Sequence, residues 1–88
     1  MKESTTVYSD PIIIACSFQV GESVAKNLLC CTNVVFTKPP MIVTSDFYRL
    51  RGYRDRAIYI YRYKLKSNFW DEWEYLHHNF IEIVPEYK

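Results

Sequence analysis

The stretch that most constrains the fold of this chain covers residues 48–66 and reads YRLRGYRDRAIYIYRYKLK. It holds seven Arg or Lys, five Tyr and one acid, so its formal charge is 7 − 1 = +6, and the rest of the 88-residue chain carries 1 − 6 = −5. Burying an unpaired cation costs several kcal/mol, so any fold must leave these side chains in water or against an anion. This segregation of charge bears on binding, although the net charge of +1 does not.

Hydrophobic patterning predicts seven elements of secondary structure. Strands are expected at residues 12–20, 34–36, 41–51, 56–66 and 80–84, and helices at residues 22–31 and 68–79. The order β-α-β-β-β-α-β predicts an α+β fold, in which an antiparallel sheet carries two short helices on one face in the ferredoxin-like split β-α-β arrangement. Residues 1–10 are expected to be a polar lead-in, and residues 11–88 a single domain.

In this plan the strands at 41–51 and 56–66 form a hairpin whose turn contains Gly52 and Asp55. Directly opposed residues share a face, so this pairing places most cations on one face and most tyrosines on the other. The tyrosine face is expected to pack against the second helix. The cationic face and the turn supply the predicted nucleic-acid-binding residues, which are Arg49, Arg51, Arg54, Arg56, Arg62, Lys64 and Lys66, with Tyr53 as a stacking residue.

Three apolar residues, Phe47, Ile58 and Ile60, fall in the middle of the cationic face under this pairing. Exposed apolar strips of this kind usually bind a partner. We therefore expect a homodimer that packs through the strip, with the cations of both copies flanking a continuous positive groove.

The letters RGY at 51–53, followed by AIYIY at 57–61, resemble the basic-Gly-aromatic strand signature of the RNA-recognition motif family over about eleven residues. In that family, exposed aromatic residues on the sheet stack on bases. The resemblance implies that Tyr59 and Tyr61 lie on the open face and that Ile58 and Ile60 lie in the core, the reverse of the hairpin assignment. The insertion at residues 54–56 departs from the signature.

A small α+β chain with a basic, Tyr-rich hairpin is also similar to the compact mRNA-cleaving toxins of bacterial toxin–antitoxin systems. That resemblance implies that Arg49, Arg56, Arg62 and Tyr61 supply charge at a scissile phosphate. The usual order of elements in those toxins differs, because more helix precedes their hairpin.

The conventional acid–base candidates are His77 and His78, which are adjacent in the second predicted helix. Neighbouring helical residues diverge by about 100°, so the two imidazoles cannot bind one metal ion together. Glu72 and Glu74 add carboxylates nearby without the spacing of a metal site. We therefore expect no enzyme, no cofactor and no metal.

The three cysteines, Cys16, Cys30 and Cys31, are odd in number and two of them are adjacent, which does not describe a disulfide framework, and they lack the spacing of a zinc finger. They are expected to be small buried residues in a reducing, cytoplasmic compartment. We expect no signal peptide in the polar first ten residues, and the apolar run IIIACSFQV is too short to span a bilayer.

The sequence therefore predicts a cytoplasmic, non-catalytic protein that binds RNA or single-stranded nucleic acid through its phosphate backbone, without a membrane. The size and composition suit a phage or viral accessory protein that counters a host nuclease or defence system in the host cytoplasm. The alternative is a protein–protein inhibitor of a host enzyme, which would dock through the acids Asp71, Glu72, Glu74, Glu82 and Glu86. A toxin-like ribonuclease is the third interpretation, and a merely solvated cationic face remains the non-functional one.

Overall fold

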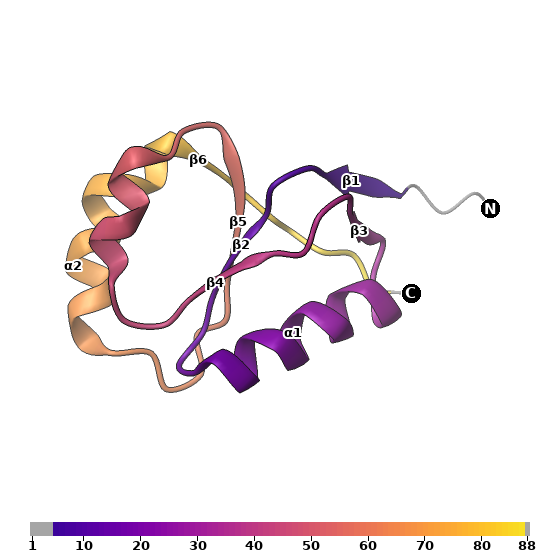
Figure 1. Ribbon diagram of the computed structural model, residues 1–88, viewed down its shortest axis with the longest axis horizontal. Helices are drawn as coiled ribbons and strands as arrows, with labels where there is room; N and C mark the ends of the chain where they lie inside the picture. The colour runs from indigo at the N-terminus through magenta and orange to yellow at the C-terminus, as the bar shows by residue number, and fades with distance from the viewer. Residues whose placement is uncertain (1–4, 88) are drawn as a thin grey trace.

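The computed structural model of this chain describes residues 5–87, which form strands, α-helices and 3-10 helices (Figure 1). The strands are β1 (Thr6–Tyr8), β2 (Ile12–Ile14), β3 (Val34–Phe36), β4 (Met41–Val43), β5 (Arg56–Ile60) and β6 (Phe80–Glu82). The α-helices are α1 (Phe18–Cys31) and α2 (Ser67–Leu76), and the 3-10 helices are η1 (Phe47–Gly52) and η2 (His77–Asn79). β1 falls inside the segment expected to be a polar lead-in, of which residues 1–4 lie outside the described residues.

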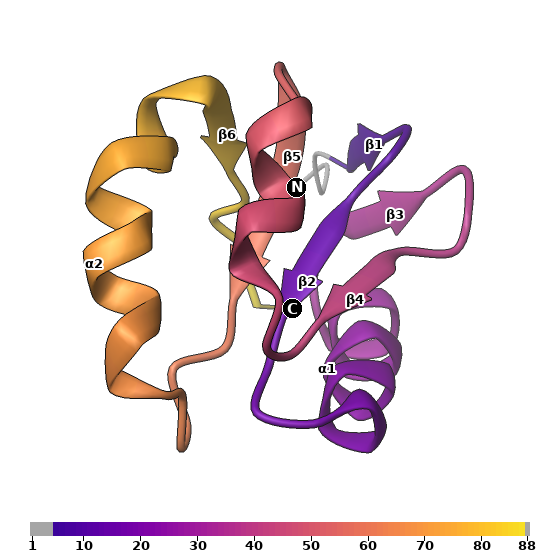
Figure 2. The same cartoon turned by 60° about the vertical axis from the view of Figure 1, so that its left-hand side comes forward.

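Every strand pairing in the described structure is parallel. The main sheet has four strands in the order β4-β2-β5-β6, and β1 pairs with β3 in a separate two-stranded sheet. Helix α1 covers one face of the main sheet, whereas η1 and α2 cover the other (Figure 2). Each connection between parallel neighbours therefore crosses over the sheet, as parallel pairing requires.

The predicted combination of helices and strands is confirmed, but the predicted antiparallel sheet and its ferredoxin-like arrangement are wrong. The reason is visible in β2, where three consecutive isoleucines, Ile12, Ile13 and Ile14, are each 0% exposed. A strand with helices on both faces buries every side chain, so it reads as a continuous apolar run. Alternation between apolar and polar residues would instead be expected in the antiparallel sheet, which has one face exposed to solvent.

The two faces of the sheet carry two separate apolar cores. Toward η1 and α2, the buried residues are Ile12, Ile14, Val43, Phe47, Leu50, Ile58, Ile60, Phe69 and Leu76. Toward α1 they are Ile13, Ala25, Leu28, Val34, Ala57 and Ile83, with the half-buried Tyr59 packed against them. The second helix thus packs against the isoleucines of β5, and the prediction that it packs against a tyrosine face is wrong.

The predicted hairpin does not form in the part of the chain that the structure describes. Its first limb divides into β4 and η1, and its second limb becomes β5, which pairs in parallel with β2. Phe47 and Leu50 explain the division, because they are three residues apart and both buried, as one face of a helical turn requires. The cations that alternate with them point to solvent from a helix and not from a strand.

Other boundaries also moved. The strand expected at 12–20 ends at Ile14, and α1 begins at Phe18, with the Ser17 side chain accepting a hydrogen bond from the Val20 amide at 3.3 Å. At the C-terminal side, the predicted strand 34–36 is confirmed, and a helix and a strand form at the expected places near residues 68 and 80. Lys66 occupies the N-cap of α2, so this helix begins one residue before its expected start at residue 68, and Asp71 and Glu72 lie beyond its first turn.

Candidate nucleic-acid interface

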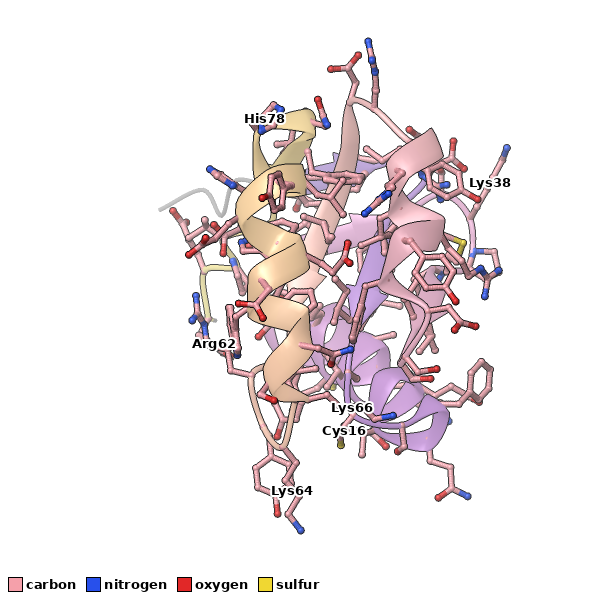
Figure 3. All side chains as sticks on the ribbon, turned by 90° about the vertical axis from the view of Figure 1, so that its left-hand side faces the viewer. Cys16, Lys38, Arg62, Lys64, Lys66 and His78 are labelled. Atoms are coloured by element: carbon pink, nitrogen blue, oxygen red, sulfur yellow. The ribbon has the colours of Figure 1, made fainter. Side chains whose placement is uncertain are left out.

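The seven cations of residues 48–66 do not form one surface. Arg49 and Arg51 lie on η1, Arg54 lies in the turn before β5, Arg56 begins β5, and Arg62, Lys64 and Lys66 follow its last residue. The five residues of β5 span about 13 Å and separate the two groups. Figure 3 shows Lys64 and Lys66 at the opposite end of the molecule from His78. The continuous cationic face expected from a hairpin is therefore absent among residues 5–87.

Two cations at the amino end of β5 already have partners within the chain. An Arg51 guanidinium nitrogen, Nη2, lies 3.4 Å from the Glu72 carboxylate, and the Arg56 Nε atom donates a hydrogen bond of 2.8 Å to the Asp10 carbonyl oxygen. Arg49 and Arg54 are exposed. Arg51 and Arg56 thus use their cationic groups in contacts that hold η1 and the segment before β2 in place.

Tyr53, the predicted stacking residue, is half-buried and covered. The Arg56 guanidinium carbon lies 4.5 Å from the centre of its ring, and its hydroxyl lies 3.7 Å from the Met41 sulfur. A nucleobase would have to displace Arg56 to reach the same ring face. The structure therefore gives Tyr53 a packing role, and its stacking role stays a prediction.

The three cations after β5 stand among aromatic rings. We call Arg62, Lys64 and Lys66 the carboxyl-end cations, because they lie at the end of the sheet where the parallel strands finish. The Arg62 guanidinium carbon lies 4.9 Å from the Trp70 ring centre, and the Lys64 Nζ atom lies 5.3 Å from that of Tyr63. All three are exposed, as is Tyr63, so this end offers charge and stacking surface together.

The carboxyl end of the sheet also receives both α-helix N-termini. Partial positive charge accumulates at a helix N-terminus, where a nearby acid is stabilising and a cation is not. Among the described residues, neither α1 nor α2 has an acid in its first turn, and α2 has Lys66 at its N-cap without a side-chain cap. The segments that link β2, β4 and β5 to their following helices hold these three cations and one acid, Asp46. Local charge and helix dipoles therefore both favour an anion here.

Two of the described non-glycine residues have a positive φ, namely Asp55, in the turn before β5, and Lys64. The Lys64 φ of 53° lies in the left-handed region, which costs a residue with a Cβ atom about 1–2 kcal/mol. Residues held in such conformations cluster at functional sites. The chain thus keeps a lysine where a glycine would be less strained.

A groove lies beside Tyr61 and Tyr63. We call it the α1–tyrosine groove, because it lies between helix α1 and the segment after β5; its volume is about 430 Å³, and it is lined by Gln19, Val20, Ser23, Val24, Asn27, Tyr61 and Tyr63. A smaller hollow adjoins it, sharing Val24, Asn27 and Tyr61 and adding Tyr59 and Tyr87. The Tyr61 amide donates a hydrogen bond of 2.9 Å to the Ile14 carbonyl oxygen, which fixes the groove between the ends of β2 and β5.

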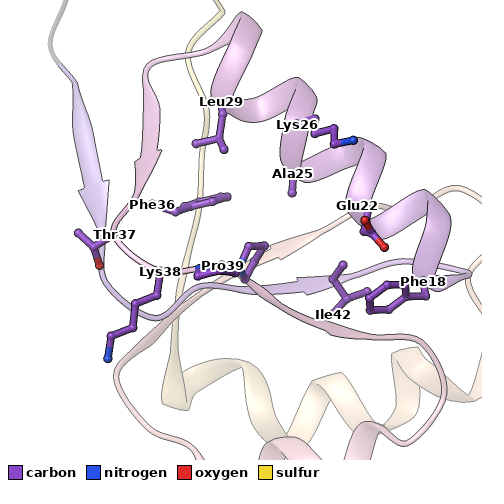
Figure 4. A pocket seen from close by; sticks show the side chains of 11 residues that line it. Phe18, Glu22, Ala25, Lys26, Leu29, Phe36, Thr37, Lys38, Pro39 and Ile42 are labelled. Atoms are coloured by element: carbon purple, nitrogen blue, oxygen red, sulfur yellow. The ribbon is translucent and has the colours of Figure 1, made fainter.

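A second groove, of about 550 Å³, lies on the other side of α1 and is mostly apolar. Figure 4 shows Ala25, Leu29, Phe36 and Pro39 around it, while the charged ends of Lys26 and Lys38 point away. A mostly apolar surface of this kind provides few groups that could bind a phosphate. The two sides of α1 therefore differ in chemistry, and the side facing Tyr61 is the polar one.

The residues of the predicted dimer strip are inside the monomer. Phe47, Ile58 and Ile60 are 2%, 0% and 8% exposed and belong to the core shared with α2. They do not form the exposed strip from which the homodimer was inferred, so that premise is wrong. The placement of Ile58 and Ile60 in the core agrees with what the RNA-recognition motif resemblance implied for them, although both faces of this sheet are covered.

Of the remaining candidate residues, Cys16 lies in the segment after β2, at the same end of the sheet as the carboxyl-end cations, whereas His77 and His78 lie at the other end (Figure 3). Cys16 is half-buried and Cys30 and Cys31 are exposed, so the prediction of three buried cysteines is wrong. The exposed His77 has its Nδ1 atom 3.1 Å from the Trp73 carbonyl oxygen, as in a helix end. Within residues 5–87, no group of three or more His, Cys, Asp or Glu side chains is placed to hold a metal ion.

Comparisons with protein-family models, curated proteins and solved structures found no match to this chain. Of the described helices, none has both the length and the apolar character needed to cross a membrane.

Sequence reasoning identified Arg62, Lys64 and Lys66 but missed their setting. It did not place α1 beside Tyr61 and Tyr63, and it did not bring the two helix N-termini together. The available signal was the apolar run of β2, which indicates a parallel sheet and thereby places the residue after each strand at one end of the sheet.

Proposed function

We propose that this protein binds single-stranded nucleic acid, with RNA as its ligand, at the carboxyl end of the parallel sheet. The observation that carries the proposal is Lys66 at the N-cap of α2, beside Arg62 and Lys64, at an end of the sheet where neither α-helix has an acid in its first turn. This arrangement is locally unfavourable in the free protein and becomes favourable when phosphates are bound.

The strand order supports this location. From β2 the chain crosses to β4 on one side through α1, and from β5 it crosses to β6 on the other side through α2. In open parallel sheets, ligands bind beyond the carboxyl ends of the strands, where the direction of the connections reverses. That point lies between β2 and β5, where Tyr61 bonds to Ile14.

The spacing of the tyrosines favours a single strand over a duplex. The ring centres of Tyr61 and Tyr63 are 6.1 Å apart, and the rings are tilted by 49°. Stacked nucleotides in a duplex rise by about 3.4 Å each, so neighbouring bases can reach both rings only when they are unstacked. Aromatic stacking of this kind contributes about 1–3 kcal/mol per base in single-strand binding.

The carboxyl-end cations supply charge, and the residues that line the α1–tyrosine groove supply stacking and hydrogen bonds; the activity that we propose is binding. Phosphate contacts of this kind depend on salt and largely ignore sequence. A role in shielding RNA from a nuclease, in the cytoplasm of a host cell, is the biological setting that we infer for such a protein.

The test is fluorescence anisotropy of labelled single-stranded RNA of about 12 nucleotides across a salt series. The wild type is compared with the double variant Arg62→Gln/Lys66→Gln and with the matched control Arg49→Gln/Arg54→Gln, which removes two exposed charges at the other group. The slope of log K against log salt is negative, and the loss of two phosphate contacts reduces its magnitude by about 1.4.

We expect that reduction in the carboxyl-end variant and a nearly unchanged slope in the control. An equal loss in the control would place the contact elsewhere and overturn the proposed site. Absence of binding by the wild type at low salt would overturn the proposed function itself.

A further inference from the structure

Helix α1 presents a row of neutral polar side chains to the α1–tyrosine groove. Gln19, Ser23 and Asn27 follow each other at intervals of four residues and all line that groove. At a rise of 1.5 Å per residue, the row extends along about 12 Å of the helix. The charged residues Glu22 and Lys26 line the other groove. The sequence pattern of α1 therefore separates charge from hydrogen-bonding capacity on its two sides.

The chemistry of this row matches base edges better than phosphates. An amide side chain both donates and accepts, so Asn or Gln can pair with the N6 and N7 atoms of adenine through two hydrogen bonds. Guanine is read mainly by Arg or Lys, and the amino group of cytosine by an acid. Among the residues that line this groove, none is an Arg, Lys, Asp or Glu.

The positions of the tyrosines bring bases to this row. Asn27 lines both the groove and the adjoining hollow, and Tyr61 does the same, so these two residues border both spaces. A base stacked on the Tyr61 ring presents its edge sideways, and α1 forms the side wall. The phosphates then remain with the carboxyl-end cations outside the groove.

We propose that Gln19, Ser23 and Asn27 read base edges and give the site a preference for adenine in single-stranded RNA. This inference rests on the proposed nucleic-acid binding. It adds the base that the polar row recognises, whereas the carboxyl-end cations bind only the phosphate backbone.

The test measures dissociation constants for labelled oligoadenylate, oligocytidylate and oligouridylate of about 12 nucleotides at one fixed salt concentration. The proteins are the wild type, Asn27→Ala, the double variant Gln19→Ala/Asn27→Ala, and Glu22→Gln as the matched control on the other side of α1. All three positions are exposed, so the substitutions leave the core intact, and circular dichroism verifies the fold.

We expect the wild type to bind oligoadenylate roughly 5- to 150-fold more tightly than the pyrimidine oligomers, the range of one bidentate base contact. Asn27→Ala reduces this ratio, the double variant brings it close to unity, and Glu22→Gln preserves it. Equal binding of all three oligomers by the wild type would overturn base reading while the proposed function stands. No binding of any oligomer at low salt would overturn both.

Discussion

The guanidinium carbon of Arg62 lies over the indole of Trp70, 4.9 Å from the ring centre. This contact joins the segment after β5 to the first turn of α2. Trp70 itself packs edge-on against the buried Phe69, at a centroid distance of 4.9 Å. The cation that we assign to phosphate binding is thus coupled through one indole to the apolar core.

This coupling makes Trp70 an internal reporter of binding. We expect RNA to change the tryptophan emission of the wild type, because a phosphate that draws Arg62 away alters the surroundings of the indole. The same titration of Trp70→Phe, which retains Trp73, should show little change in emission while binding persists by anisotropy. The Arg62→Ala substitution should weaken RNA binding and lower the free energy of unfolding by no more than about 1 kcal/mol, the size of an exposed cation–π contact. Unaltered wild-type emission at saturating RNA would contradict the assignment of Arg62.

Lys66 at the N-cap of α2 should lower the stability of the protein while it strengthens RNA binding. Lysine has no acceptor for the first-turn amides, whereas serine does, so Lys66→Ser should raise the free energy of unfolding by about 1 kcal/mol. The same substitution removes a phosphate contact and should weaken RNA binding. Urea unfolding and anisotropy measure the two effects separately. A variant that is more stable and binds as well as the wild type would show that Lys66 is not a ligand residue.

Gly21 should be required for the close approach of α1 to β4. A Cβ atom at this position would overlap Ile42 Cγ2, so Gly21→Ala introduces overpacking, which costs about 1–3 kcal/mol. In a background carrying Ile42→Ala, the same substitution should instead stabilise the protein by about 1 kcal/mol, the helix-propensity difference between Ala and Gly. Chemical denaturation of the four proteins of this cycle measures the change of sign. Equal effects in both backgrounds would contradict the contact.

Tyr59 should make the protein less stable at alkaline pH. Burial raises the pKa of its hydroxyl above the ordinary value of 10.0, and Tyr87 and Tyr61 add to the effect. Because the folded state holds this proton more tightly, the resulting stability is fully present below pH 10.0 and is lost as the pH rises through the folded-state pKa. Urea unfolding at about pH 8 and about pH 11 should show a smaller loss of stability in Tyr59→Phe than in the wild type. An equal loss in both would contradict this role of Tyr59.

Part of the fold can be predicted from local pattern. The spacing of Phe69, Trp73 and Leu76 indicates a helix with one apolar face, and α2 has that face. The strand positions near residues 34 and 80 follow from similar local signals. These elements are set by residues that are close in sequence, so single-sequence reasoning recovers them.

The hairpin could not be predicted correctly in the same way, because two patterns coincide in residues 47–51. The cations Arg49 and Arg51 alternate as on a strand, while Phe47 and Leu50 have the spacing of a helical turn. Tertiary contact favours the helical turn, since both apolar residues are buried against α2. The Phe47 and Phe69 ring centres lie 4.8 Å apart. An error in this one segment changes the sheet from parallel to antiparallel and moves every cation.

RNA binding at the carboxyl end of the sheet can be mapped residue by residue through amide chemical shifts. Amide signals of the isotope-labelled wild-type protein would be followed while unlabelled single-stranded RNA of about 12 nucleotides is added. The largest shifts should fall on residues 61–67 and on the row of α1 that faces Tyr61, with little change at Arg49 and Arg54. Shifts centred on residues 49–56, or none at saturating RNA, would contradict binding at this end of the sheet.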